Sequence, residues 1–481
     1  MGITSAIGSA LTGLTANAWA TDVIASNIAN AQTPGYGPRN LELAARTGGG
    51  VAVAGVQRGT DLALLNDRRA ASAEVAGTGV LADFYTALET GLGQPGEAGA
   101  LGTTLSDLGA ALVQASAQPD SAAALSALLD SANAVAGKIN ALSTQIQTAR
   151  GAADGAIGRQ VTQLNTALGQ VADLNAQIQS QVINGGQPSA LIDQRQALLD
   201  QISEIVPIRQ MERPNGTVAL MTTGGALLLD GMTPATIGFT ATNGTVTPDM
   251  TLASGALSGL TLNGVAVSST SPLFTGGALA ANLTLRDQAA PAAQSQLDAL
   301  ARDLAGRFDA PGVDPTLTPG MAGLFTDAGT PVSASNELGL AARFAVNPAV
   351  DPAKGGALWH LRAGIGAAAP NAPGDASILN AMGAALAAVQ VPASGGLGTG
   401  AVDANGFAAQ ILSAAGNARL TAQNAASFAT ARSTTLTDAA LKQGVDTDQQ
   451  MAQLLVVQKS YAANAKVVQT ADSLLQALLE I

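Results

Sequence analysis

One histidine, His360, is the side chain in this sequence best suited to proton transfer near neutral pH, and it follows Trp359. A catalytic triad or a metal cage would need further partners, most often histidine or cysteine. The chain has 1 His and 0 Cys. We therefore interpret His360 as a structural residue, and the missing thiols exclude disulfide bonds and thiolate chemistry.

Two carboxylates, Asp193 and Asp200, are spaced so that they share one helical face. Arg195 and Gln196 are close in sequence, and we expect them to pair with these carboxylates in a packing network rather than in acid–base catalysis. The glycine cluster at 395–400 does not stand between a predicted strand and helix, which argues against phosphate binding. We expect no catalytic residue, no metal and no cofactor, and predict that the protein is not an enzyme.

The net negative charge argues against nucleic acid and anionic membranes as binding partners. Lys and Arg total 22 against 34 Asp and Glu, which gives −12, and charged residues make up only 12% of the 481 residues. Ordinary soluble domains carry roughly 25%, so much of this surface must be weakly polar and suited to stacking in assemblies. No Lys or Arg precedes Arg39, and we expect neither a signal peptide nor a membrane anchor in the first forty residues.

Both ends of the chain carry an apolar seam with alternating spacings of three and four, which is typical of helices that meet other helices. We expect the two seams to pair with each other. The C-terminal seam is Met451, Leu454, Gln458, Tyr461, Ala465, Val468, Asp472, Leu475 and Leu479. The N-terminal seam is Ile7, Leu11, Leu14, Ala18, Thr21, Ala25 and Ile28.

Several local sequence signals predict where helices and strands begin and end. A first helix should run from about residue 3 to 31, ending with Asn30 in a left-handed conformation and a type II turn at Pro34 and Gly35. Two short strands should follow around the glycines at 48–50, and Asp61 should cap the next helix. For the last helix we expect a capping box in which Asp446 or Thr447 pairs with Gln449 or Gln450.

The spacing of apolar residues changes twice in the interior of the sequence. Residues 105–205 are helical apart from breaks at 118–120 and 185–188. After Pro207 the period becomes two, and three Asn-Gly pairs predict hairpins; these begin at Asn215, Asn243 and Asn263. Helical spacing returns at 297–308 and at 407–428, whereas 311–400 is rich in Pro, Gly and Ala and has weak periodicity.

The predicted fold class is mainly α with inserted β, with long coiled-coil-like terminal and core helices. We expect terminal helices at 1–40 and 441–481 that pair for axial assembly. A helical body should comprise 41–205 with 287–310 and 401–440. Residues 206–286 should form an inserted β domain, and 311–400 a small mixed or irregular region. Because an isolated terminal helix is marginal, we expect both ends to be loose in the monomer and to fold on assembly.

Two segments carry a family resemblance. The run Asn27-Ile28-Ala29-Asn30-Ala31-Gln32-Thr33-Pro34-Gly35-Tyr36 and the run from Gln458 to Asp472 are similar to the terminal signatures of the axial proteins of the bacterial flagellum, the rod, hook and hook-associated family. The long helical section, residues 187–195 and Arg286-Asp287 resemble the hook-associated members. The chain departs from the pattern at Gly37-Pro38 and at Gln449-Gln450.

The resemblance implies a secreted structural protein at the junction between hook and filament, exported through the flagellum's own channel. It implies self-association in a ring, contacts with hook protein and with a second junction protein, a cytoplasmic export chaperone on the C-terminal helix, and no nucleic acid or membrane. The expected assembly interface comprises Ile7, Leu11, Leu14, Asn27, Ile28, Asn30, Thr33, Pro34, Gly35, Tyr36, Met451, Leu454, Leu455, Gln458, Tyr461, Ala465, Val468, Asp472, Leu475 and Leu479.

Two alternatives stay open. A hook protein or another axial flagellar protein would share the same terminal signatures. A secreted cell-wall hydrolase is more remote, and only the unassigned region 311–400 motivates it.

Overall fold

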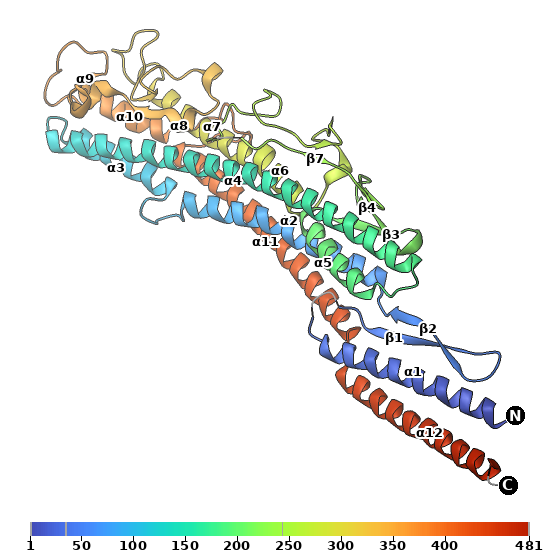
Figure 1. Ribbon diagram of the computed structural model, residues 1–481. Helices are drawn as coiled ribbons and strands as arrows, with labels where there is room; N and C mark the ends of the chain where they lie inside the picture. Colours follow the sequence, from blue (N-terminus) through green and yellow to red (C-terminus); the bar gives the residue numbers. More distant parts are fainter. Residues whose placement is uncertain (1, 34–35, 243, 480–481) are drawn as a thin grey trace.

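The computed structural model describes residues 2–33, 36–242 and 244–479. Figure 1 shows an elongated, bent molecule in which a multi-helix body narrows into a two-helix section that carries both chain ends. Long helices dominate and small antiparallel sheets flank them, so the predicted fold class, mainly α with inserted β, is confirmed.

The helices differ widely in length. Their bounds are α1 Ile3–Ala29, α2 Leu62–Leu92, α3 Leu101–Ala117, α4 Ala122–Ile183, α5 Ser189–Ile205, α6 Gly277–Thr284, α7 Ala290–Phe308, α8 Leu340–Arg343, α9 His360–Ala363, α10 Ser377–Ala387, α11 Ala404–Lys442 and α12 Thr447–Leu479. A π-helical turn, Leu285–Ala289, joins α6 to α7.

The strands form four small sheets. Their bounds are β1 Arg39–Ala45, β2 Val51–Arg58, β3 Ile208–Glu212, β4 Val218–Thr222, β5 Leu227–Asp230, β6 Thr233–Pro234, β7 Ile237–Gly238, β8 Thr261–Leu262, β9 Val265–Ala266, β10 Phe325–Asp327 and β11 Phe344–Val346. All pairs are antiparallel, in the orders β1-β2, β3-β4-β5-β6, β7-β8-β9 and β10-β11.

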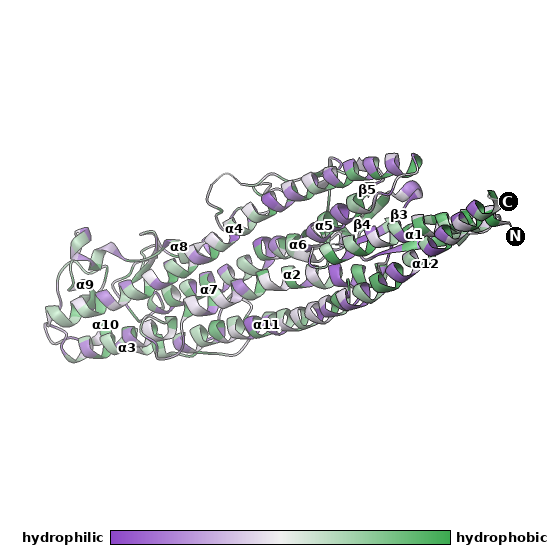
Figure 2. Cartoon of the chain, turned by 60° about the horizontal axis from the view of Figure 1, so that its bottom comes forward, coloured by the Kyte–Doolittle hydropathy of each residue, from purple (hydrophilic) through white to green (hydrophobic). Residues whose placement is uncertain are grey.

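Helix α4 is the spine of the body. Its 62 residues correspond to a length of about 93 Å at 1.5 Å per residue. The N-terminal half packs into one hydrophobic core with α3, α7 and the segment 313–386. The C-terminal half packs into a second core with α5, α6 and the strands from β3 to β8. Figure 2 shows hydrophilic and hydrophobic residues alternating along α4, as expected of a helix with one buried face.

Local sequence signals placed most of these elements correctly. Asp61 caps α2, since its side chain accepts hydrogen bonds from the Ala63 and Leu64 amides. The predicted hairpin at Asn263 joins β8 to β9, and the one at Asn215 joins β3 to β4. Asn243 lies outside the described residues, as do Pro34 and Gly35, for which a turn was predicted. Residues 311–400 hold only short helices and the β10-β11 pair.

Three expectations were wrong. Asn30 has φ −105° and ψ 12°, which is not left-handed. Residues 277–284 form α6, although they fall within the range predicted as β. Here Leu279, Ala281, Leu283 and Leu285 alternate like a strand, while Leu279 and Leu283 are also spaced by one helical turn, so the apolar period alone was ambiguous. The β1-β2 hairpin, assigned to the body, packs along α1 instead.

A hydrogen bond to Thr12 of α1 holds the β1-β2 hairpin in this position. The Thr12 hydroxyl Oγ1 accepts a hydrogen bond of 3.2 Å from the Val51 amide, and the turn glycines lie close to α1. A Cβ on Gly50 would stand 2.3 Å from Thr12 Oγ1, so only glycine allows this approach. The hairpin therefore covers one face of α1 (Figure 1).

Candidate assembly site at the terminal helices

Helices α1 and α12 run antiparallel and bring the two chain ends to one tip (Figures 1 and 2). At the inner end the Asn27 amide donates to Gln450 Oε1 at 3.1 Å. Farther out, a Cβ on Gly13 would stand 2.6 Å from Asn464 Nδ2. Glycine at position 13 therefore lets the two helices approach closely.

Alanines and branched apolar side chains are buried together where these helices meet. Ala10, Ala16 and Ile24 are buried in α1, and Ala471 is buried in α12. Half-buried residues complete the contact surface of α12; they are Leu454, Val457, Asn464, Ala465 and Val468.

The two terminal helices pair with each other as expected, but the predicted seams match the contact only in part. Leu11 is 53% exposed, Tyr461 50% and Leu479 87%. Also exposed are Ala18, Thr21, Ala25, Met451, Leu455, Gln458, Asp472 and Leu475, whereas Ile7, Leu14, Ile28, Leu454, Ala465 and Val468 are half-buried. Leu454, Ala465 and Val468 therefore lie at the contact with α1, whereas several other large apolar seam residues stay exposed.

Asn27 is the polar centre of the terminal section. Its Nδ2 donates to the Arg39 carbonyl oxygen at 2.8 Å as well as to Gln450, and its Oδ1 accepts from Tyr36 Oη at 2.8 Å and from the Arg39 amide at 3.0 Å. Both donors and both acceptor positions of the amide are therefore satisfied at 1% exposure. This single side chain joins α1, β1 and α12.

The neighbouring signature residues support the end of α1. Asn30 donates to the Ser26 carbonyl oxygen at 2.9 Å and accepts from the Thr33 hydroxyl at 3.2 Å. The predicted capping box of α12 forms only in part. Asp446 accepts from the Asp448 and Gln449 amides, whereas Gln450 reaches across to Asn27.

Asp193 of α5 attaches the terminal section to the body. Arg39 Nη2 donates to it at 3.1 Å, Arg58 Nε at 2.8 Å and the Gly37 amide at 3.3 Å. The Arg39 guanidinium also lies 4.8 Å from the centre of the Tyr36 ring. We call this cluster, Gly37, Arg39, Arg58 and Asp193, the Asp193 clamp. A cavity of about 410 Å³ adjoins it, between the loop after α1, the start of α2 and the end of α11.

The expected partners of Asp193 and Asp200 were wrong. Asp200 pairs with Arg68 and with Arg69, whose Nε is 2.7 Å away, and burial lowers the pKa of Arg69. Arg195 instead donates to Asn175 Oδ1 and to the Gly216 carbonyl oxygen, both at 2.8 Å. Burial lowers the pKa of Arg195 to about 10, which still leaves it charged at neutral pH. The true partners come from distant segments, which spacing along one helix does not indicate.

The clamp makes a testable contribution to stability. We expect Asp193→Asn to lower the free energy of unfolding by about 1 to 3 kcal/mol, because two largely buried guanidinium groups lose a charged acceptor. Cleavage by protease at the loops that connect the terminal section to the body should also accelerate. Asp230→Asn is the matched control, since its pair with Arg213 is exposed and should change stability by less than about 1 kcal/mol. Equal effects of the two substitutions would contradict the clamp.

His360 makes local contacts within its own segment. His360 Nδ1 lies 2.9 Å from the Gly364 carbonyl oxygen, and its ring stacks on Trp359. Among residues 2–33, 36–242 and 244–479, no three His, Asp or Glu side chains could hold a metal ion. Within the same ranges no helix is both long and apolar enough to cross a membrane.

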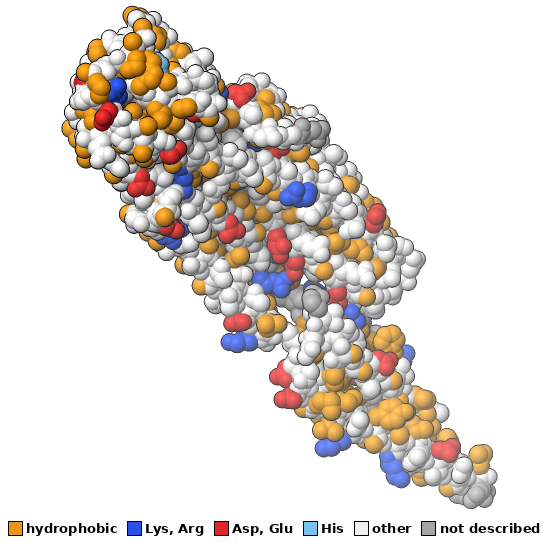
Figure 3. Space-filling view, turned by 90° about the vertical axis from the view of Figure 1, so that its left-hand side faces the viewer, with side chains coloured by type: hydrophobic (Ala, Val, Ile, Leu, Met, Phe, Trp, Pro, Cys, Tyr) orange, Lys and Arg blue, Asp and Glu red, His pale blue; other side chains and the backbone are white. Residues whose placement is uncertain are grey.

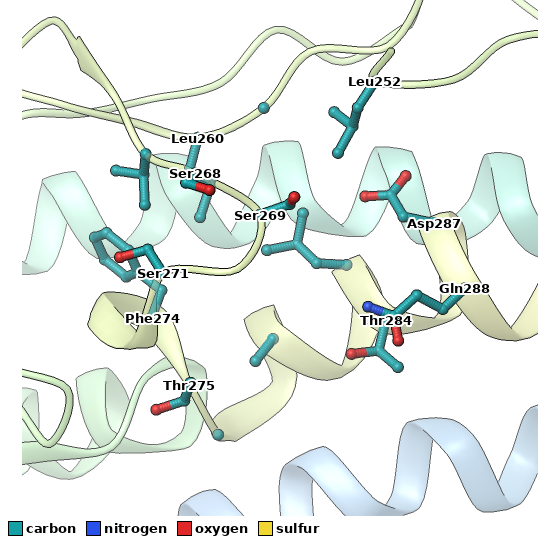
Figure 4. Close-up of a pocket in the computed structure, with 15 residues that line it drawn as sticks. Leu252, Leu260, Ser268, Ser269, Ser271, Phe274, Thr275, Thr284, Asp287 and Gln288 are labelled. Carbon is teal, nitrogen blue, oxygen red and sulfur yellow. The ribbon is translucent and has the colours of Figure 1, made fainter.

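A second cavity, of about 270 Å³, lies between the β7-β9 region and α6. Figure 4 shows hydroxyl, amide and apolar side chains around it, with Asp287 at one side. Arg286 holds both oxygens of Asp287, at 2.8 and 2.9 Å. No second carboxylate lines this cavity among the described residues, so it offers no acid–base pair.

Family models match three parts of the chain. Residues 85–313 match the "Flagellar hook-associated protein FlgK helical domain". Residues 7–36 match the "Flagella basal body rod protein" model, and 441–481 match the "Flagellar basal body rod FlgEFG protein C-terminal" model. The two terminal matches coincide with α1 and its following loop and with α12.

Curated relatives agree with these matches. The chain is 26% identical over 242 residues to flagellar hook-associated protein 1 of Escherichia coli, covering 48% of this chain and 44% of that protein. It is 27% identical over 242 residues to the protein of the same name in Salmonella typhimurium, covering 48% and 43%. The matched region thus spans less than half the length of these relatives.

The flagellar hook junction protein FlgK from Burkholderia pseudomallei matches with a TM-score of 0.45 and 21% identity, over 55% of this chain and 47% of that one. The rod-type models match both ends, as the terminal signatures predicted, and the hook-associated helical domain lies between them, as the resemblance of the interior predicted. The chain belongs to the rod, hook and hook-associated family of flagellar axial proteins, and its helical domain is of the hook-associated kind.

Proposed function

We propose that this protein is a structural junction subunit of the bacterial flagellum, which assembles at the distal end of the hook and connects the hook to the filament. The observation that carries the proposal is the terminal α1–α12 pair, which leaves large apolar side chains uncovered in a single copy. Leu11, Leu455 and Leu474 are each more than half exposed. Side chains of this size on the surface of long helices favour contact with further helices.

The proposed partners rest on the family matches and on the same exposed surface. Copies of the chain assemble into a ring through the terminal section, with hook protein on one side and a second junction protein on the other. A cytoplasmic export chaperone covers α12 before secretion, because Leu455 and Val456 are 57% and 64% exposed. Export through the flagellar channel suits a chain that has 0 Cys and therefore no disulfide bond to reduce. The role is structural rather than enzymatic.

The terminal helices order fully only on assembly. Of the described side chains of α12, only Gln450 and Ala471 are buried in a single copy. A helix with so little buried surface is marginal on its own. The body, in contrast, has two extensive hydrophobic cores and folds independently of its neighbours.

Deletion of the gene tests the proposed position. Electron microscopy of the deletion strain should show complete hooks without filaments, with filament subunits released into the medium. Reintroducing the intact gene should restore filaments. Absent hooks would favour the alternative of a hook or other axial protein, whereas filaments retained on the hooks would refute the junction function.

A further inference from the structure

We propose that neighbouring copies join head to tail, with the outward stripe of α1 from one copy lying antiparallel in a groove along α12 of the next. This rests on the proposed function and specifies which surfaces meet. The outward stripe of α1 is Ile7, Leu11, Leu14, Ala18, Asp22 and Ala25. The outward stripe of α12 is Val456, Lys459, Ala463, Val467, Thr470 and Leu474.

The stripe on α1 has no partner within a single copy. Helix α12 covers one side of α1, and the β1-β2 hairpin covers another. Leu11 is 53% exposed, and Ala18 and Ala25 are exposed as well. Ile7 and Leu14 are half-buried and border the same surface. A row with this spacing on a long helix suits burial against a further helix.

The stripe on α12 borders an open groove that a helix could fill. The groove has a volume of about 500 Å³ and is lined mainly by apolar groups of α1 and α12, including Ile3, Ala6, Ala463, Val467 and Leu474. Ala6 and Ala463 are small, so large side chains of a neighbouring helix fit between Ile3 and Leu474. Figure 3 shows apolar side chains gathered over the narrow terminal section, with only a few charged groups among them.

The spacings of the two stripes match residue by residue. Along α1 the steps are 4, 3, 4, 4 and 3 residues, and along α12, read backwards from Leu474, they are also 4, 3, 4, 4 and 3. An antiparallel alignment therefore places every member of one stripe opposite a member of the other. The opposed pairs are Ile7–Leu474, Leu11–Thr470, Leu14–Val467, Ala18–Ala463, Asp22–Lys459 and Ala25–Val456.

Charge complementarity supports this register. Asp22 is the one charged residue in the sequence of α1, and Lys459 and Lys466 are the two basic residues in that of α12. All three are exposed, and over the described ranges none of them forms an ion pair. The register places Asp22 opposite Lys459, and a charge pair of this kind selects one alignment over its neighbours.

This contact is heterologous, because the two surfaces that meet are different. A head-to-tail contact leaves a free stripe at one end and a free groove at the other, so it continues around a ring or along a helix until it closes. A symmetric dimer would instead bury one surface against itself.

Cysteine cross-linking tests the register in assembled flagella, because the chain has no cysteine of its own. One strain co-expresses two chains, one with Ala18→Cys and the other with Ala463→Cys. Both substitutions are small and at exposed positions. We expect mild oxidation to give a covalent dimer in this strain and none where either variant is the only copy. Placing the two cysteines on separate chains excludes a bond within one molecule.

The matched control combines Ala18→Cys with Val456→Cys. In the proposed register Ala18 lies opposite Ala463, and Val456 lies about 10 Å farther along α12. This separation is too large for a disulfide bond, so no dimer is expected. A dimer from Ala18→Cys alone would show a symmetric contact and overturn the proposal. Intact, motile flagella without the mixed dimer would also overturn it, while leaving the junction function standing.

Charge reversal gives an independent measurement on the same alignment. Asp22→Lys places like charges opposite each other, and we expect about a tenfold loss of chain in isolated flagella. Adding Lys459→Asp to the same chain restores opposite charges between neighbours and should recover most of the loss. Failure of the second substitution to rescue the first would contradict the pairing of these two positions.

Discussion

Cells whose only copy of this protein carries Leu454→Asp should secrete filament subunits but retain no filaments. Leu454 lies half-buried on the face of α12 that packs against α1, one turn from the Asn27–Gln450 hydrogen bond. The substitution removes apolar contact and places a carboxylate between the helices, at a cost on the order of 3 kcal/mol. This corresponds to more than a hundredfold loss in the helix-pairing equilibrium. Filament counts by electron microscopy and filament protein in the medium measure the effect.

The body should stay folded in this variant, because both hydrophobic cores lie away from α12. Val113→Asp is the matched control, since Val113 is 71% exposed on α3 of the body and its substitution should leave swimming unchanged. Leu475→Asp, farther along α12, should give the same phenotype as Leu454→Asp. Normal filaments on Leu454→Asp and Leu475→Asp cells would contradict an assembly function for the terminal pair.

Arg286→Met should lower the free energy of unfolding by about 3 to 5 kcal/mol, because it leaves buried carboxylates without their counter-charge. Arg286 is fully buried, with Nη1 2.7 Å from Asp154 Oδ1 and Nε 2.8 Å from Asp287 Oδ1. Its Nη2 also donates to the Ser258 carbonyl oxygen at 3.0 Å. The side chain thus joins α4, the π-helical turn and the loop before β8.

Urea denaturation of the purified protein measures this loss. Arg213→Met is the control, because the Arg213–Asp230 pair is exposed on both sides and should contribute less than about 1 kcal/mol. A change in Arg286→Met no larger than that of the control would show that the buried network does not stabilise the insert.

Features encoded within a few residues could be predicted from the sequence. Asp61 marks the start of α2 because a short carboxylate before an apolar run satisfies free helix amides. The breaks at Pro119 and Gly185 bound α4, because proline and glycine end helices. The Asn263-Gly264 turn connects β8 to β9 for the same local reason.

Features that depend on distant segments could not be predicted. The period of three and four showed that α1 and α12 meet helices, but Leu11 and Tyr461 remain exposed because periodicity does not say which of two stripes meets which partner. Asp193 receives Arg39 and Arg58 from more than 130 residues away. The sequence signal available for Asn27 was its place in the family signature, and its pairing with Gln450 required the fold.

The position of the protein in the flagellum tests the central claim most directly. Labelled antibody against the body should be applied to isolated hook-basal bodies and viewed by electron microscopy. A junction subunit should give a thin labelled zone at the distal end of each hook. Label along the whole hook, or on the rod, would contradict that claim.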